Sequence, residues 1–341
     1  MKTAIIGTGF IARMHKAAMR SLGRSLDAVV GTTVEKAAAF ASDTAAGPYC
    51  RVTDELLAAV DCLIMCTPPA EHGELLERCL RAGKHVFCEK PLCLSSAEAE
   101  KLALLAEKSS GVAVVNFNNR FYPSVLKMRD RVSDVTAVQG SYLQQYHCMP
   151  APFSWRYTDP MRATSEIGSH MIDLVTFVTG QDITSVRGRF SYAAPQRILG
   201  ADGMLYPAGE GTPITVENED EAGIDFTLDR GGNGHLELSE IAAGHINDLT
   251  LKVETDRGEI CWDNRLPHIL RCFGSAEDDG EQGDFEDTFA MALEAFYAAA
   301  EQGENRDLRL CTFAQAAQNV KVCQAIYDSA HAGGAEVRVT Y

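Results

Sequence analysis

The stretch TAIIGTGFIARMHKAAM, residues 3–19, decides the fold of the N-terminal part of this chain. It starts with an apolar run typical of a buried strand, and Gly7, Gly9 and Ala12 then occupy the G-x-G-x-x-G/A positions of a turn that opens a helix. Gly7 permits the tight turn, Gly9 lets a pyrophosphate approach the backbone, and Ala12 allows close packing of helix on strand. Because a helix N-terminus favours anions, the stretch predicts a dinucleotide-binding site.

The same alternation of strand and helix continues to residue 118. Apolar runs that predict further strands occur at 26–31, 61–69, 84–91 and 112–118. Amphipathic segments that predict helices occur at 34–42, 53–60, 71–83 and 95–109. Continuous apolar strands separated by such helices indicate a parallel sheet that is covered on both faces.

Polar residues follow the predicted strands at one edge of this sheet. In VFCEKPLCL, residues 86–94, Glu89 and Lys90 come directly after an apolar run. Charges at a strand end are often merely exposed to solvent, and Glu89 and Lys90 would then have no functional role. However, Gly7–Gly9, Thr67–Pro69 and Asn116–Asn118 lie at equivalent strand ends, and ligands of such sheets bind beyond these ends. The convergence favours a functional site.

The end of the second strand bears on the choice between NAD and NADP. Proteins that prefer NAD usually carry an acid there, which binds the ribose hydroxyls. This chain has Gly31, Thr32 and Thr33 instead, and Glu35 falls inside the next predicted helix. Either threonine could donate to a 2′-phosphate, although Lys36 is the nearest cation and no arginine is present. We therefore expect NADP to be favoured slightly over NAD.

The chain changes character after Asn118. Residues 136–147, 183–193, 217–243, 247–264 and 267–273 are β-rich runs, joined in places by glycine-containing turns. Helices are expected at 118–132 and near 165–179, 284–302 and 312–331, and residues 193–213 read as a surface excursion. We predict one domain over 1–118 and a second over 119–341 with a largely antiparallel open sheet, whose C-terminal segment could pack back on the first domain.

One predicted helix of the second domain carries a polar stripe. Glu166, His170 and Asp173 lie at i, i+4 and i+7, on one helical face, and the opposite face is apolar. A stripe of this kind is usually a solvated face, and a lone histidine is usually structural. Two acids that flank a histidine can instead orient the imidazole and tune its proton affinity for acid–base catalysis.

The composition excludes several classes of protein. The formal net charge of -16 over 341 residues disfavours nucleic acids and anionic membranes as partners. The N-terminus lacks the pattern of a signal peptide, so we expect a cytoplasmic protein. The 11 cysteines are scattered, without CxxC or zinc-like spacing, so we expect neither a disulfide framework nor a bound metal.

These motifs together carry a family resemblance. GTGFIARMH, CTPPAEH, CEKPL, NFNNRFYP and EIGSHMID occur in order and resemble the glucose–fructose oxidoreductase / inositol dehydrogenase / rhizopine-catabolism (Gfo/Idh/MocA) family. The resemblance covers essentially the whole chain. It implies an α/β protein with an N-terminal Rossmann domain and a C-terminal α+β domain whose open sheet often forms the oligomer interface. It also implies hydride transfer between nicotinamide and a hydroxyl-bearing carbon of a sugar, sugar acid or cyclitol.

The family's functional residues map onto this chain position by position. Its Glu-Lys-Pro maps onto Glu89, Lys90 and Pro91, with Lys90 as the catalytic lysine, and its D-x-G-x-H-x-x-D pattern maps onto Glu166, Gly168, His170 and Asp173. Glu166 departs from the usual Asp, which puts the proton route in doubt. The resulting catalytic set is Lys90, His170, Glu166 and Asp173. The cofactor set is Gly7, Gly9, Phe10, Ile11, Thr32, Thr33, Thr67, Pro68, His72, Glu89 and Lys90. The substrate set, in which each residue could equally be structural, is Asn118, Arg120, Tyr122, Trp155 and Arg156.

Two other functional classes stay open at this point. One is a hydrolase of the same fold that uses tightly held NAD in glycoside cleavage, and the other is a non-catalytic NAD(P)-binding sensor. The presence of Lys90 and His170 argues against a sensor, which needs neither. We expect a small polyhydroxylated substrate and a homodimer or homotetramer that buries the open face of the antiparallel sheet.

Overall fold

The computed structural model describes residues 1–274, 279–280 and 287–340. The chain divides into two compact units, Met1–Phe121 with Phe285–Val320 and Tyr122–Asp284 with Lys321–Tyr341. Of the segment that was expected in the second domain and could pack back on the first, the described residues 287–320 group with the first unit. Among the helices of the described residues, none has the length and apolar composition that a bilayer span requires.

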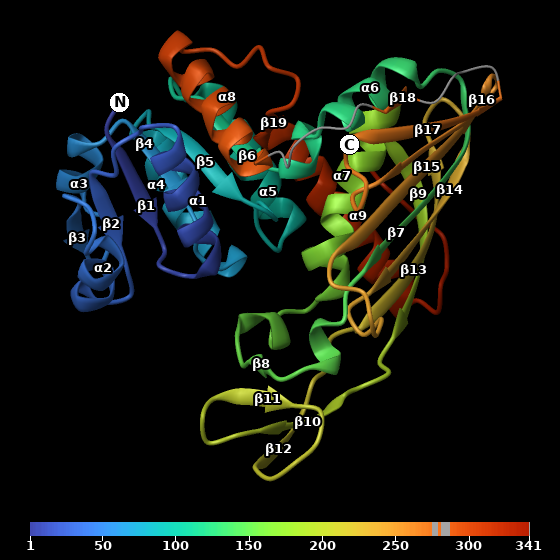
Figure 1. The fold of residues 1–341 in the computed structure, drawn as a ribbon, viewed down its shortest axis with the longest axis horizontal. Coiled ribbons are helices and arrows are strands. Elements are labelled where there is room, and N and C mark those ends of the chain that lie inside the picture. The colour runs from blue at the N-terminus through green and yellow to red at the C-terminus, as the bar shows by residue number, and fades with distance from the viewer. Residues whose placement is uncertain (275–278, 281–286, 341) are drawn as a thin grey trace. The chain divides into compact units, whose positions relative to one another are not determined.

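The first unit is built on a seven-stranded sheet in the order β19-β6-β5-β4-β1-β2-β3 (Figure 1). Neighbouring strands pair in parallel, except that β19 runs antiparallel to β6. This confirms the predicted Rossmann-type parallel sheet, to which the sequence analysis had not assigned β3 or β19. The strands are β1 (Thr3–Ile6), β2 (Ala28–Val30), β3 (Gly47–Tyr49), β4 (Cys62–Met65), β5 (His85–Glu89), β6 (Ala113–Asn116) and β19 (Cys311–Thr312).

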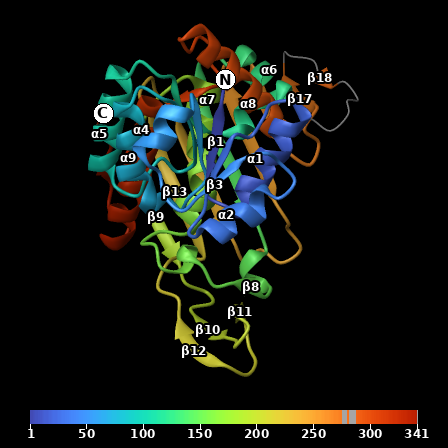
Figure 2. The same ribbon diagram turned by 90° about the vertical axis from the view of Figure 1, so that its left-hand side faces the viewer.

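Helices cover both faces of this sheet, because alternate strand residues are buried on opposite sides. One face packs against α3, α4, α5 and the start of α9, and the other packs against α1, α2 and α8. Figure 2 shows α1 and α4 on opposite sides of β1. The helices are α1 (Phe10–Ser21), α2 (Val34–Ala41), α3 (Asp54–Ala59), α4 (His72–Arg81), α5 (Ser96–Lys108), α8 (Thr288–Gln302) and α9 (Phe313–His331). Of the helix expected near 284–302, residues 284–286 lie outside the described residues.

Local sequence signals explain where several of these helices begin and end. The side chains of Thr33, Thr53 and Ser95 accept hydrogen bonds from backbone N–H groups in the first turns of α2, α3 and α5. The helix α8 ends at Gly303, whose φ of 70° favours glycine. Short 3-10 helices occur at η1 (Pro69–Glu71) and η2 (Asn118–Phe121).

The second unit is built on a nine-stranded sheet in the order β18-β17-β16-β15-β7-β14-β13-β9-β20. All neighbours pair antiparallel except β14 and β7, which are parallel, so the predicted largely antiparallel sheet is confirmed. The strands are β7 (Val135–Leu143), β9 (Ile183–Ser191), β13 (Glu221–Leu228), β14 (Asn233–Ser239), β15 (Asp248–Thr255), β16 (Gly258–Asp263), β17 (Ile269–Gly274), β18 (Asp279–Gly280) and β20 (Val337–Arg338).

Helices cover one face of this sheet. A core forms between the sheet, α6 (Pro123–Arg131), α7 (Ser169–Thr179) and the later part of α9, and Figure 1 shows these helices on one side of the strands. Residues of alternate register on the other face, such as Thr250, Lys252 and Arg271, are half-buried or exposed.

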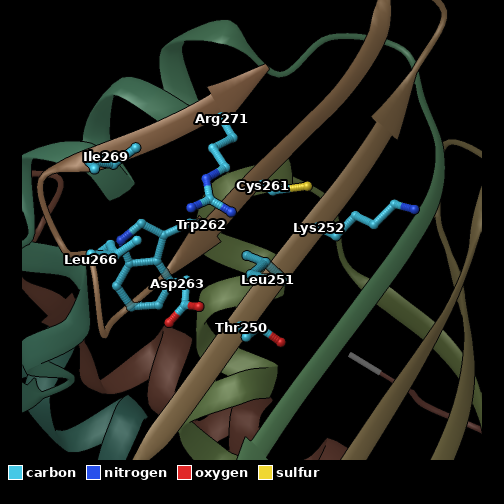
Figure 3. A pocket seen from close by; sticks show the side chains of 9 residues that line it. All are labelled: Thr250, Leu251, Lys252, Cys261, Trp262, Asp263, Leu266, Ile269 and Arg271. Carbon is cyan, nitrogen blue, oxygen red and sulfur yellow. The ribbon is translucent and has the colours of Figure 1, made fainter. Parts of the chain in front are cut away.

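A hollow of about 170 Å³ lies in the second unit along β15, β16 and β17 (Figure 3). Figure 3 shows Trp262, Asp263 and Arg271 gathered on adjacent strands, with Lys252 set apart. None of the residues that line this hollow belongs to the predicted catalytic, cofactor or substrate sets. The residues are Thr250, Leu251, Lys252, Cys261, Trp262, Asp263, Leu266, Ile269 and Arg271.

The predicted surface excursion forms a small sheet of its own. Residues 196–215 supply β10 (Gln196–Leu199), β11 (Met204–Tyr206) and β12 (Thr212–Thr215), and β11 pairs with β8 (Ala151–Pro152). A minor core of Ala151, Tyr157, Leu205 and Val216 holds it together. The short 3-10 helices η3 (Tyr146–Cys148) and η4 (Trp155–Tyr157) flank β8.

Candidate functional site

The turn after β1 provides a narrow cradle. Gly7 has a φ of 109°, and a Cβ at this position would lie 2.6 Å from the Cys66 carbonyl oxygen, so only glycine fits. Gly9 is the N-cap of α1, and a Cβ there would meet nothing within 4 Å. Phe10 is largely exposed and Ile11 half-buried in the first turn of the helix. There is therefore open space beside Gly9, at the N-terminus of α1.

Glu89, the last residue of β5, is fixed by two buried neighbours. Its Oε1 accepts a hydrogen bond from His15 Nε2 on α1 at 2.6 Å and another from Asn116 Nδ2 at the end of β6 at 2.8 Å. Glu89 is 7% exposed and His15 is fully buried, between Phe87 and Phe289. Through Oε1, Glu89 therefore links α1 to the ends of β5 and β6.

The charge of Glu89 follows from this environment. Burial alone would raise the pKa of the carboxyl, but the hydrogen bonds from His15 and Asn116 and the charge of Lys90 hold the pKa below its ordinary value of 4.5. Lys90 follows Glu89 directly and is half-buried, and the peptide bond between Lys90 and Pro91 is cis. Lys90, which is predicted to be catalytic, thus directly follows a carboxylate that is ionised and held in place.

His72 connects the loops that follow β4 and β5. Its Nε2 lies 2.9 Å from the Thr67 carbonyl and its Nδ1 lies 3.0 Å from the Leu92 carbonyl. The side chain is fully buried, and burial lowers the pKa of the imidazole despite the two carbonyls. His72 belongs to the predicted cofactor set, and its ring lies between the carbonyls of the loops that carry Thr67 and Leu92.

The two threonines that follow β2 bear on the choice between NAD and NADP. Thr32 and Thr33 are exposed, and Thr33 Oγ1 accepts a hydrogen bond from the Lys36 backbone N–H at 3.2 Å, which caps α2. The Thr33 side chain also hydrogen-bonds to the Glu35 carboxylate, which uses its hydroxyl proton, whereas Thr32 is exposed to solvent.

In the second unit, the predicted polar stripe spans two kinds of helix. Glu166 lies in a π-helical turn, Thr164–Gly168, and His170 and Asp173 lie in α7. Such turns are often found at functional sites. Nearly all residues of α7 are buried, whereas Glu166 and His170 are half-buried. Asp173 is only 3% exposed.

Two neighbours shape the surroundings of Glu166 and His170. Arg156 Nε donates a hydrogen bond to Glu166 Oε2 at 2.8 Å, and its guanidinium lies over the Trp155 ring at 4.6 Å. The ring of His170 lies 6.1 Å from that of Tyr142. Three residues predicted separately, Glu166, Arg156 and Trp155, are thus in one cluster.

The remaining predicted substrate residues are placed differently. Asn118 is half-buried and donates from Nδ2 to Thr288 Oγ1 at 3.0 Å. Arg120 is 2% exposed and donates to Gln315 Oε1 at 3.2 Å, so it serves the interior of the first unit. Tyr122 begins the second unit and packs against Trp262.

The residues of the first unit fit a dinucleotide. Only glycine fits the Gly7 turn, and the space above Gly9 is open. At the ends of β4 and β6, the buried Thr67 Oγ1 and Asn116 Oδ1 have no hydrogen-bond partner among the described residues. Buried polar atoms usually have a hydrogen-bond partner, so two without one at neighbouring strand ends are consistent with a site that binds a further group. Gly7, Gly9 and Thr67 would hold the phosphates and the nicotinamide end.

Two residues near the site, His15 and Asp159, were not predicted from the sequence. His15 lies inside α1 and appeared to be an ordinary helix residue, although its partner Glu89 had been singled out. Asp159 follows the Trp155–Arg156 pair and is half-buried, and burial and the charge of Glu166 raise its pKa to about 6. For Asp159 no local sequence signal exists, since its environment is made by residues of a later element.

Comparisons with known proteins agree with this geometry. The family described as "Oxidoreductase family, NAD-binding Rossmann fold" matches residues 1–117, and the "GFO/IDH/MocA C-terminal domain" matches residues 128–261. Levoglucosan dehydrogenase of Pseudarthrobacter phenanthrenivorans is 25% identical over 307 residues, which are 82% of this chain and 78% of that protein. Inositol 2-dehydrogenase of Rhizobium meliloti is 24% identical over 318 residues, 89% of each chain.

Solved structures show the same fold. The crystal structure of a levoglucosan dehydrogenase in complex with NADH and L-sorbose superposes with a TM-score of 0.89 at 21% identity, over 100% of this chain and 99% of that one. An oxidoreductase domain protein from Kribbella flavida gives a TM-score of 0.87 at 23% identity, over 100% and 99%. At these identities the likeness establishes the fold alone.

Proposed function

The chain belongs to the Gfo/Idh/MocA oxidoreductase family, and from this premise we propose that it is an NAD(P)-dependent dehydrogenase or reductase of CH–OH groups. Its substrate is a sugar, a sugar acid or a cyclitol. The relatives named levoglucosan dehydrogenase and inositol 2-dehydrogenase support this substrate class. The observation that carries the proposal is the fixed end of β5, where Glu89 is tied to α1 and β6 and Lys90 follows directly.

The mechanism assigns the proton side of the reaction to two residues. Hydride leaves a carbinol carbon as the hydroxyl loses its proton, and the bound nicotinamide supplies the acceptor for that hydride. Lys90 stabilises the negative charge that develops on the substrate oxygen. His170 accepts the hydroxyl proton as general base. Glu166, held by Arg156, orients the ring or a neighbouring hydroxyl, and the buried Asp173 acts through the ring.

The cofactor preference follows from the end of β2. No acid stands at the usual position, Thr32 or Thr33, and the exposed Thr32 hydroxyl can donate to a 2′-phosphate, although the Glu35 carboxylate lies beside Thr33. This supports a slight preference for NADP. The related levoglucosan dehydrogenase binds NADH in its crystal structure, so NAD is the alternative.

The assembly is a homodimer or homotetramer that buries the face of the nine-stranded sheet opposite α6, α7 and α9. Two apolar side chains of β17 on that face are open to solvent, Ile269 at 36% and Phe273 at 56%. Across the same face, Lys252 forms ion pairs with Glu254 and Glu259. Exposed apolar groups among paired charges are typical of a surface that meets a second copy.

The test is an absorbance assay for reduced nicotinamide over a panel of polyols, sugars and sugar acids, with NAD and NADP in parallel. We expect turnover with at least one of them, and we expect Lys90→Ala and His170→Ala to reduce turnover about 10²–10³-fold each. The double substitution should cost much less than the two losses combined, because the groups act together. His170→Ala should also remove the rise of activity with pH through the neutral range, since the base must be deprotonated.

A matched control separates catalysis from folding. Lys84 is a half-buried lysine that precedes β5 at its other end, so Lys84→Ala should keep turnover near normal. Melting temperatures are measured on the same preparations. Near-normal turnover in Lys90→Ala would show that Lys90 is not catalytic. A protein that keeps its cofactor through purification but shows no net redox turnover would instead be the NAD-dependent glycoside hydrolase.

A further inference from the structure

Three consecutive polar residues are buried where the chain enters β13. Asn218 is 5% exposed, Glu219 0% and Asp220 2%, and we refer to these three as the polar tripeptide. Burial of an amide and two carboxyl groups is unfavourable unless each finds hydrogen-bond partners. None of the three belongs to the predicted catalytic, cofactor or substrate sets, so their partners show what the tripeptide does.

Asn218 binds the turn that carries two predicted substrate residues. Its Nδ2 group donates one hydrogen bond to the Arg156 carbonyl at 2.7 Å and another to the Asp159 carbonyl at 3.0 Å. The turn is closed by the backbone N–H of Asp159, which donates to the Trp155 carbonyl at 3.0 Å. One buried amide group thus fixes both ends of the segment 156–159.

Glu219 binds the start of the helical segment that carries the predicted catalytic stripe. Its Oε2 accepts a hydrogen bond from the Arg162 backbone N–H at 3.0 Å, and its Oε1 accepts one from the Thr164 backbone N–H at 2.8 Å. The N–H groups of a first helical turn have no acceptor within the helix. The N-cap residue is Ala163, whose side chain cannot accept a hydrogen bond, so a carboxylate from a distant segment caps this helix.

Asp220 anchors the tripeptide on the nine-stranded sheet. Its backbone N–H donates to the carbonyl of Ser191, the last residue of β9, at 3.0 Å. Its carboxylate accepts a hydrogen bond from the Ala194 backbone N–H at 2.8 Å and forms an ion pair with the buried Arg162. The turn and the helix start are therefore both held from one segment that is itself fixed.

The two elements held by the tripeptide meet in one contact. Arg156 Nε, on the turn, donates a hydrogen bond to Glu166 Oε2 at 2.8 Å. The backbone N–H of Glu166 donates to the Arg162 carbonyl at 2.7 Å, so the place of Glu166 follows from that of the capped helix start. This contact forms only while Asn218 and Glu219 keep the turn and the helix at their present spacing.

We propose that Asn218 and Glu219 are positioning residues, which hold the substrate side and the catalytic side of the site at a fixed spacing. Asn218 sets the place of Trp155 and Arg156, and Glu219 sets that of the turn with Glu166. This role rests on the proposed function and adds to it two residues that act through others. A misplacement of about 1 Å can lower an enzymatic rate about 10²-fold, so such a role is measurable.

The experiment measures kcat and KM of two near-isosteric variants, with the compound and cofactor that the absorbance panel identifies. Asn218→Asp replaces the donor by an oxygen that both carbonyls repel, so the KM should rise about tenfold while kcat changes little. Glu219→Gln turns an NH₂ group toward one of the two backbone N–H groups, so kcat should fall about 10–100-fold with little change in KM. A purely structural role would lower the folded fraction but leave KM and kcat per folded molecule unchanged.

A matched control and a second variant accompany these two. Asn264 is half-buried in the same unit and donates from Nδ2 to the Asn247 carbonyl at 2.8 Å, so Asn264→Asp should keep both KM and kcat. Glu219→Asp keeps the charge but shortens the side chain, and it should lower kcat in the same way if Glu219→Gln does not fold.

Two measurements test the positioning without substrate. Of the two tryptophans, Trp262 is 1% exposed and Trp155 is half-buried, so quenching by iodide reports Trp155. Quenching should increase about twofold in Asn218→Asp, and hydrogen exchange at residues 162–164 should be about tenfold faster in Glu219→Gln. Unchanged KM and kcat in both variants, or unchanged quenching and exchange, would overturn the positioning role. If the wild type turns over no compound, the proposed function fails, and quenching and exchange decide the positioning role by themselves.

Discussion

Replacing Glu89 by alanine should destabilise the first unit strongly, although Glu89 is one residue among many in its core. The carboxylate accepts hydrogen bonds from His15 at 2.6 Å and from Asn116 at 2.8 Å, and 93% of its accessible surface is buried, since it is 7% exposed. Alanine would leave two buried donors without an acceptor, at about 1–3 kcal/mol each. Together with the broken buried pair, we expect a loss of about 3–5 kcal/mol in the free energy of unfolding.

Related variants should lose smaller amounts of the free energy of unfolding. Glu89→Gln should lose about half as much, because both donors bind Oε1 and the one oxygen of glutamine can accept both hydrogen bonds, although the charge of the carboxylate is lost. His15→Phe places an apolar ring between Phe87 and Phe289, so the double variant Glu89→Ala/His15→Phe should cost less than the two single losses combined.

The assay is urea unfolding followed by circular dichroism and by tryptophan fluorescence. Both tryptophans, Trp155 and Trp262, lie in the second unit, so fluorescence reports that unit and serves as an internal reference. The pKa of Glu89 lies below 4.5 in the folded protein, so its contribution is present above that pH and is lost as the pH falls through the lower value. The wild type and Glu89→Ala should therefore converge in acid. A loss below about 1 kcal/mol at neutral pH would refute this reasoning.

Four further predictions concern the cofactor, the fold and the assembly. In fluorescence titrations NADP should bind at least as tightly as NAD, and an NAD preference above about tenfold, or 1.4 kcal/mol, would contradict our interpretation of Thr32 and Thr33. Gly7→Ala should weaken cofactor binding at least about tenfold and destabilise the protein by about 1–3 kcal/mol, because of its φ of 109° and the Cys66 carbonyl; unchanged binding would exclude the cradle. Burial lowers the pKa of His72 below its ordinary 6.5, so its contribution to stability is full above pH 6.5 and decreases as the pH falls further. In His72→Gln the urea midpoint should therefore change less between pH 7 and pH 5 than in the wild type. Light scattering should give a dimeric or tetrameric mass. Phe273→Glu should reduce this mass, because Phe273 is exposed on the face proposed to be buried, and a monomeric wild type would contradict the proposed assembly.

Much of the fold could be predicted because its signals are local. The apolar runs of β1, β4, β5 and β6 and the turn at Gly7 are readable within a few residues. The strand β3, with the sequence GPY, has no such pattern, and it forms by pairing with β2. The segment Cys311–Thr312 is too short to indicate a strand, and only its pairing with β6 makes it one.

The site was predictable to the extent that its residues lie in motifs. Lys90, Glu166 and His170 could be named from spacing and resemblance. Whether Glu89 faces a ligand or the interior could not, because this depends on His15, which lies 74 positions earlier in the sequence. A carboxylate at a strand end looks the same in both cases. Asp159 was missed for a similar reason, since Asn218 of a distant loop sets the position of its turn.

The late return of the chain to the first sheet has a consequence for synthesis on the ribosome. The strand β19 covers the edge of β6, and α8 fills the face around Phe87 with Phe296 and Tyr297. Until these residues emerge, a nascent chain of residues 1–121 exposes an unpaired edge and an open apolar face, both of which promote aggregation. The first unit can therefore mature only after the intervening 122–284 has been made. A fragment that ends at residue 121 should accordingly need a chaperone or a separate peptide covering 287–320 to remain in solution.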